Sequence, residues 1–215
     1  MTVTIALVEV RPGAGEVAAN EATILRYARQ ADRLGAAVTV FPASMLTGVG
    51  ADDPRAGDGL RRQADEALTR LALGLDREGL GGRRVVVGTT GTGVSDMPTN
   101  AAAVLHKGRV ALSVTDQTSL SDAVFPAHGL RFGLAVGSAP GQAGPGPGDP
   151  DGGDPDGAGR SDSTGRRNAD DQDGLAAILV LGDGLAYGAA ADGHRISPPA
   201  PSHEGLTLWE LGSQA

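Results

Sequence analysis

The chain has 215 residues, enough for one domain with a substantial core, and a formal net charge of −8. Binding to nucleic-acid phosphates needs clustered Lys and Arg, so this charge argues against a nucleic-acid partner. Cysteine is absent, which excludes disulfides, thiolate metal sites and a thiol nucleophile. No apolar run approaches the roughly 20 residues that span a bilayer. The first residues do not resemble a signal peptide, so we expect a cytoplasmic protein without a membrane partner.

The first part of the chain alternates between strand-like and helix-like segments. Residues 2–10 are β-branched and almost continuously apolar, which is typical of a buried strand. Apolar spacing predicts a helix over 21–34, with Asn20 as its N-cap. A second buried strand over 36–41 and a second helix over 60–75 follow. This alternation is typical of a layered α/β domain.

The later segments predict short strands joined by tight turns. A glycine-containing turn at 106–108 and the Ala191–Gly193 turn are hairpin signals. The apolar runs that we interpret as strands cover residues 83–89, 100–105, 109–115, 130–136, 174–182, 185–190 and 205–212.

Residues 138–173 differ in composition from the rest of the chain. They contain no Leu, Ile, Val or aromatic residue and are rich in Gly, Pro and Asp. Such a segment cannot bury enough apolar surface to offset the ~1–2 kcal/mol per residue that backbone ordering costs. We interpret it as a disordered linker between an N-terminal portion, 1–137, and C-terminal strands, 174–215, that complete the same domain. A metal-binding acidic tract is the less favoured interpretation, because the aspartates lack the spacing of a calcium loop.

Four stretches follow, in the same order, the motifs of one enzyme family. They are LGAAVTVFPASMLTG, NAAAVLHKGRV, GLRFGLAVG and the ending ADGHRISPPAPSHEGLTLWEL. The chain therefore resembles the nitrilase (carbon–nitrogen hydrolase) superfamily, most nearly the glutaminase-type domain of glutamine-dependent NAD synthetases. The resemblance implies an α/β protein with a nitrilase-like α-β-β-α sandwich, here incomplete and interrupted by the linker.

The resemblance also implies a catalytic Glu, Lys and Cys. In the family the Cys attacks an amide or nitrile carbon, the Glu transfers protons, and the Lys stabilises the oxyanion. The positions that match them hold Ala43, Gln117 and Gly137 in this sequence. The loop after Gln117 is shortened, and the helices expected after Gly137 are missing. We therefore predict a catalytically inactive pseudoenzyme.

We expect such a protein to act as an interaction, regulatory or structural subunit. Its expected partner is another protein: an intact nitrilase-like or amidotransferase-type subunit, or a second copy of this chain. The alternatives are an amidohydrolase or glutaminase acting on a C–N bond, a small-molecule sensor that keeps the pocket, and a decaying gene product.

A substituted catalytic set is the less favoured interpretation. Ser138 lies one residue past the Cys position, and Ser44 adjoins the Glu position. A serine nucleophile needs a base within hydrogen-bond reach, and His128 is the nearest candidate, with Asp116 or Asp122 to orient it. A solvated or capping role is more common for such residues.

The sequence predicts neither a metal nor a cofactor. The four histidines lack the spacing of metal ligands, and the glycine-rich stretch 85–96 lacks the Gly-Lys-Ser/Thr of a phosphate-binding loop. Trp209, in the predicted closing strand, is expected to be a core residue rather than an exposed contact.

Overall fold

The computed structural model describes residues 2–93, 96–137, 175–182, 185–190, 195–196 and 205–212. The predicted linker and the Ala191–Gly193 turn lie outside these residues. The elements, in chain order, are β1 (Thr2–Val8), α1 (Val17–Arg33), β2 (Val38–Val40), α2 (Asp58–Arg77), β3 (Arg84–Thr92), β4 (Pro98–His106), β5 (Arg109–Thr115), β6 (Val124–Ala127), β7 (Leu130–Val136), β8 (Ala177–Gly182), β9 (Leu185–Ala190), β10 (Arg195–Ile196) and β11 (Leu206–Gly212).

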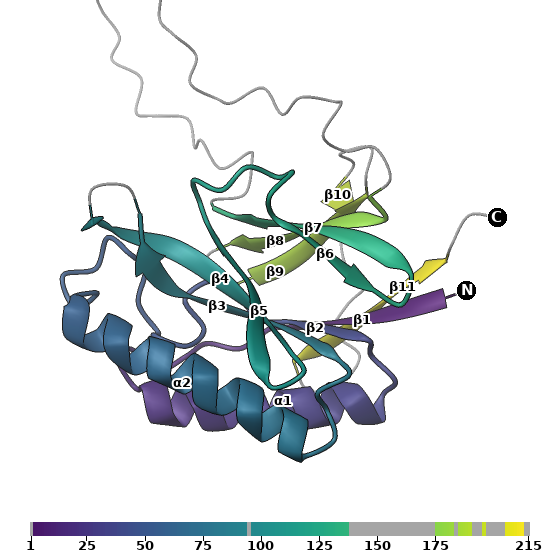
Figure 1. Ribbon diagram of the computed structural model, residues 1–215, viewed down its shortest axis with the longest axis horizontal. Helices are drawn as coiled ribbons and strands as arrows, with labels where there is room; N and C mark the ends of the chain where they lie inside the picture. The colour runs from purple at the N-terminus through teal and green to yellow at the C-terminus, as the bar shows by residue number, and fades with distance from the viewer. Residues whose placement is uncertain are drawn as a thin grey trace, which may run out of the picture.

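Within the described ranges, two β-sheets face each other and two helices cover the outer face of one of them (Figure 1). The larger sheet has the order β11-β1-β2-β3-β4-β5, and the smaller has the order β10-β9-β8-β7-β6. β1, β2 and β3 are parallel, whereas β11, β4 and β5 pair antiparallel to their neighbours. This is the mixed α/β sandwich that the sequence predicts. No described helix covers the outer face of the smaller sheet.

The two helices pack on the larger sheet through one apolar face each. α2 buries Ala64, Ala67, Leu68, Leu71 and Leu75, which confirms the helical spacing found in the sequence. These residues share a hydrophobic cluster with the helix-facing side chains of the larger sheet. At the end of α2, Glu78 forms an ion pair with Arg29 of α1, so the helices are also connected at the surface. No helix in the described part of the chain is long and apolar enough to cross a membrane.

A second hydrophobic cluster lies between the two sheets. It is built mostly from Val, Leu and Ala, and its aromatic members include a stacked pair, Phe125 and Phe132, with ring centroids 5.7 Å apart. Trp209, 8% exposed, belongs to this cluster, which confirms its prediction as a core residue. Side chains from both sheets meet here, including Leu179 of β8 and Trp209 of β11.

The start of α1 differs from its prediction. The helix begins at Val17, and Asn20 lies in its first turn with a 3% exposed side chain, so the prediction of Asn20 as the N-cap is wrong. The amide oxygen of Asn20 accepts a hydrogen bond from the Gly13 N–H (2.8 Å). Its NH₂ group donates to the carbonyls of Gly13 (2.8 Å) and Leu46 (3.1 Å). The side chain satisfies buried backbone groups of two loops, and this role outweighs capping.

We predict that Asn20→Ala lowers the free energy of unfolding by about 3 kcal/mol, because it leaves buried backbone groups without partners. Asn20→Asp, which keeps a good capping residue but loses the NH₂ donors, should cost nearly as much. Urea denaturation measures both, with the α1 substitution Thr23→Ala, at a partly exposed position, as a control expected to change stability by less than about 0.5 kcal/mol. A near-neutral Asn20→Asp would restore the capping interpretation.

Candidate functional site

The loop that carries Ala43 follows β2 and is almost wholly buried. Ala43 is 7% exposed, and its methyl group belongs to the cluster between the sheets. β3 passes close to this loop at Gly88: a Cβ on Gly88 would overlap the Pro42 carbonyl oxygen and lie 2.6 Å from the Cα of Ala43. Only glycine permits this approach. The position that the resemblance assigns to the family's glutamate is therefore an apolar core position here.

Backbone hydrogen bonds hold the same loop to β3. The Phe41 N–H donates to the Val86 carbonyl (2.9 Å), and the Leu46 N–H donates to the Gly88 carbonyl (3.0 Å). Ser44 adopts a left-handed φ of +56°, and its carbonyl accepts from the Gly48 N–H at 2.7 Å. A buried loop is tolerated because its backbone polar groups find partners.

The Lys and Cys positions lie after β5 and β7. Gln117 is exposed in the turn after β5, where a Cβ on Gly93, after β3, would lie 3.2 Å from the Gln117 side-chain nitrogen. Gly137 follows β7 with a φ of +152°, and no atom lies within 4 Å of a Cβ built on it. Asp116 and Val136, their neighbours in sequence, line one cavity. The structure thus brings these positions to one end of the sandwich.

That cavity has a volume of about 320 Å³. It lies between the β5–β6 connection and the end of β7, and its walls combine apolar side chains with an acid and two hydroxyls. A carboxylate oxygen of Asp116 accepts a hydrogen bond from Thr99 Oγ1 at 2.5 Å. The volume falls in the range of about 300–1,000 Å³ typical of small-molecule sites. The lining residues are Thr115, Asp116, Thr118, Leu120, Leu134, Ala135, Val136 and Ile178.

Sequence reasoning missed this cavity, although its signal was present. The connection after Gln117 is shorter than in the family, and β6 pairs with β7 only up to Gly133. The last residues of β7 therefore have no β6 neighbour at the cavity edge. A short loop indicates that strand pairing stops early. Where the pairing stops is decided by tertiary contacts.

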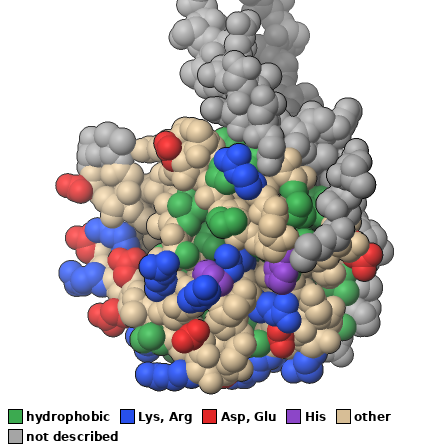
Figure 2. All heavy atoms as spheres, turned by 45° about the vertical axis from the view of Figure 1, so that its right-hand side comes forward, with side chains coloured by type: hydrophobic (Ala, Val, Ile, Leu, Met, Phe, Trp, Pro, Cys, Tyr) green, Lys and Arg blue, Asp and Glu red, His purple; other side chains and the backbone are tan. Residues whose placement is uncertain are grey.

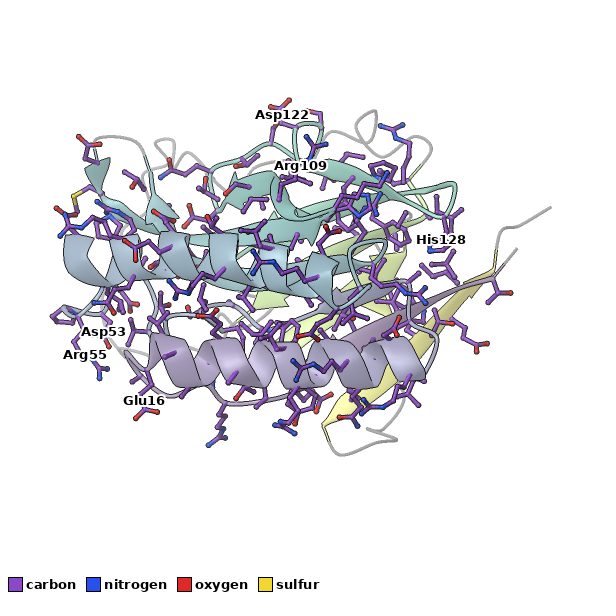
Figure 3. The ribbon with its side chains drawn as sticks, turned by 60° about the horizontal axis from the view of Figure 1, so that its bottom comes forward. Glu16, Asp53, Arg55, Arg109, Asp122 and His128 are labelled. Atoms are coloured by element: carbon purple, nitrogen blue, oxygen red, sulfur yellow. The ribbon has the colours of Figure 1, made fainter. Side chains whose placement is uncertain are left out.

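The structure does not bring His128 to the other candidate residues. His128 is exposed in the β6–β7 turn with a φ of +49°. β7 separates it from Gly137, a distance of about 20 Å at the rise of about 3.3 Å per strand residue. Figure 3 labels His128 at one end of the molecule and Asp53, in the loop that continues from Ala43, at the other.

The remaining candidates have no catalytic partner among the described residues. Ser44 is 9% exposed, and its hydroxyl has no hydrogen-bond partner there, so no base activates it. Asp122 accepts a hydrogen bond from Ser119 at 2.6 Å and does not contact a histidine. Ser138 lies outside the described residues.

The single lysine is remote from the site. Lys107 lies in the β4–β5 turn, whereas the Asp116 N–H bonds to the Asn100 carbonyl at the other end of β4. The six residue steps from Asn100 to His106 span about 20 Å at the rise of a strand. Within the described ranges, no group of three or more histidines and carboxylates is placed to hold a metal ion.

The sequence matches no protein-family model and no curated protein. The structure resembles a glutamine-dependent NAD⁺ synthetase from Acinetobacter baumannii, with a TM-score of 0.63 and 16% identity over 99% of this chain and 46% of that one. The synthetase from Cytophaga hutchinsonii gives 0.61 and 13%, over 98% and 43%. An amidase from Nesterenkonia sp. gives 0.61 and 14%, over 97% and 90%.

These similarities show the fold, which is nitrilase-like, and confirm at that level the resemblance carried by the motifs. The chain spans less than half the length of the two synthetases. Identities of 13–16% carry no information about activity, because one fold supports many functions and chemistry resides in particular residues.

We predict that Thr90→Val raises the free energy of unfolding by about 1 kcal/mol, because it removes a buried hydroxyl that has no partner. Thr90 is 1% exposed in β3, and valine has nearly its shape. Thr99→Val is the matched control: it removes the donor to Asp116 and should destabilise the protein by a similar amount. Chemical denaturation compares the two, and a destabilised Thr90→Val would mean that its hydroxyl has a partner.

Proposed function

We propose that this protein is a catalytically inactive, nitrilase-fold pseudoenzyme that acts as an interaction or regulatory subunit. The proposal rests on the residues found at the three positions that match the family's catalytic set. The glutamate position is a methyl group packed in the inter-sheet core, and the lysine and cysteine positions are Gln117 and Gly137. The chain contains no cysteine that could replace the nucleophile.

The comparison with an amidase supports this proposal. In a glutamate-to-glutamine mutant of the amidase from Nesterenkonia sp. AN1, 15% identical to this chain, acrylamide has added to the active-site cysteine. A thiolate supplies the covalent route in that chemistry, and losing the nucleophile of a catalytic unit removes most of its rate enhancement. Retention of the fold without the nucleophile favours a role in which the scaffold is used for binding.

The proposed partner is another protein, either an intact nitrilase-like or amidotransferase-type subunit or a second copy of this chain. Retention of the two sheets without the family's catalytic groups supports a protein partner, whereas the apolar cluster on the outer face of the smaller sheet is already buried. Leu175, Ile178 and Val180 form a small cluster there, with Leu120, Val124 and Ala135 packed against it. No described helix covers that face.

We predict that the purified chain releases no ammonia above the blank from glutamine, asparagine or simple amides. A sensitive coupled ammonia assay checks this, with an active nitrilase-fold amidase as the positive control. Turnover that survives repurification would contradict the proposal. In that case, comparing the turnover of Ser44→Ala and Ser138→Ala with that of the wild type establishes whether one of these serines is the nucleophile.

A second candidate function, a small-molecule sensor, is favoured by the cavity beside Asp116. A ligand that binds only the native state at 100 times its Kd stabilises it by about 2.7 kcal/mol. For a chain of this size such a ligand should raise Tm by about 5–10 °C.

We predict that Ala135→Leu, which places a larger side chain in the cavity, abolishes any such ligand shift. Ala19→Leu, on the exposed face of α1, should leave the shift unchanged. Thermal denaturation with glutamine, asparagine and simple amides as probes measures both variants. Equal shifts in both would show that the ligand binds elsewhere.

A further inference from the structure

Some arginines in the described part of the chain pair with carboxylates, and others, among them Arg62 of α2 and Arg84 and Arg109 of the larger sheet, have no described ion pair. On the helices and the loop before α2, Arg29, Arg55, Arg61 and Arg70 each form an ion pair with a carboxylate. The cations where β3, β4 and β5 meet are mostly without such partners. Arg83 pairs with Asp32, but no described carboxylate pairs with the side chains of Arg84, Lys107 or Arg109. In a chain of net charge −8, this group is an unneutralised positive surface.

Three of these side chains form a row across adjacent strands. In the ladder, Val85 pairs with Leu105 and His106 pairs with Arg109, so Arg84, His106 and Arg109 occupy successive strands at one level. Strands lie about 4.8 Å apart, so the row spans about 10 Å. We call Arg84, His106 and Arg109, together with Lys107 in the adjoining turn, the basic row. Figure 2 shows Lys and Arg side chains gathered around the described histidines on this face.

The internal contacts of the basic row leave its charge available. The guanidinium of Arg84 lies 2.6 Å from His106 Nδ1, and the same Nδ1 lies 3.2 Å from the Arg83 carbonyl. Burial lowers the pKa of His106, and the charges of Arg84 and Lys107 lower it further. Among the described residues, Asp76 lies beside Gly108 on the helix side and Asp32 pairs with Arg83. The guanidinium of Arg84, half-buried, has one further contact, with the Gly82 carbonyl at 3.4 Å.

The basic row ends at a free strand edge. β5 is the last strand of the larger sheet and pairs only with β4 among the described residues. Its sequence, RVALSVT, contains no proline and no charge beyond Arg109, and Val110 is 38% exposed. Proteins usually protect such an edge with charges, proline or a covering segment. By contrast, the edge strand β6 carries Pro126.

We propose that the free edge of β5 is the docking site for an extended acidic segment of a partner protein. The segment adds as a strand beside β5 and places carboxylates opposite Arg109 and the basic row. Backbone hydrogen bonds supply the affinity of such strand addition, and side-chain pairs supply its specificity. The edge of β5 is positively charged at one end and otherwise apolar. It therefore favours a partner segment in which acidic and apolar residues alternate. This inference rests on the proposed function, whose partner it describes chemically.

The test uses the ¹⁵N-labelled full chain and a synthetic peptide, acetyl-Thr-Val-Glu-Val-Glu-Val-Thr-amide. In an NMR titration we expect shifts of the β5 amides and none in β11, the opposite edge of the same sheet. Replacing Glu by Gln in the peptide, or N-methylating alternate peptide amides, should weaken binding at least tenfold. Arg109→Glu should also weaken peptide binding at least tenfold, because Arg109 is exposed and forms no described ion pair. High salt should also weaken binding.

Arg62→Glu, the same charge reversal at an exposed α2 position without an ion pair, is the matched control and should change affinity less than twofold. Equal binding of the Gln or N-methylated peptide, or an equal loss in Arg62→Glu, would overturn the proposal. Tighter binding of inorganic polyphosphate would assign the basic row to phosphates instead. Self-association abolished by Arg109→Glu would assign the edge to a second copy of this chain.

The ammonia assay on the same sample separates the two proposals. Peptide binding at β5 together with amide hydrolysis would overturn the inactive-subunit proposal and leave the docking site standing. No hydrolysis together with no peptide binding would overturn the docking site alone.

Discussion

The rest of this structure depends on the contact between its two sheets. The inner faces are packed with small and branched apolar side chains, and aromatic residues make up only 3% of the chain. Such a core is stable only when its small side chains fit closely, since each lost contact in a densely packed interior lowers the stability of the fold. Ala43 is one of these side chains. The position that would carry the family's proton-transfer group therefore contributes to packing here.

The loop around Ala43 is held in place by contacts made by other residues. Asn20 links this loop to the segment before α1 through hydrogen bonds to Gly13 and Leu46. Gly88 lets β3 approach closely enough to bond the loop backbone. These contacts fix the path of the chain independently of which side chain occupies position 43. The fold that these contacts support is shared with the synthetases and the amidase.

Electrostatics divide the molecule in a way that its net charge does not reveal. The helix surface carries arginine–carboxylate ion pairs. Each contributes little to stability because both partners are solvated. The basic row, from Arg84 to Arg109, lacks such partners among the described residues. The row lies at one end of β5, and the cavity beside Asp116 lies at the other end of the same strand.

The sequence by itself determined the order of the strands and helices apart from β6 and β10, the apolar face of α2, and the absence of a thiol, because each follows from local spacing or composition. Its motifs also indicated the nitrilase-like fold. Only the tertiary structure decided that Asn20 joins two loops instead of capping a helix, and that His128 lies a full strand away from Gly137. The tertiary structure also created the cavity and aligned the basic row. These features depend on strand register and on where pairing stops, which arise from contacts between residues distant in sequence.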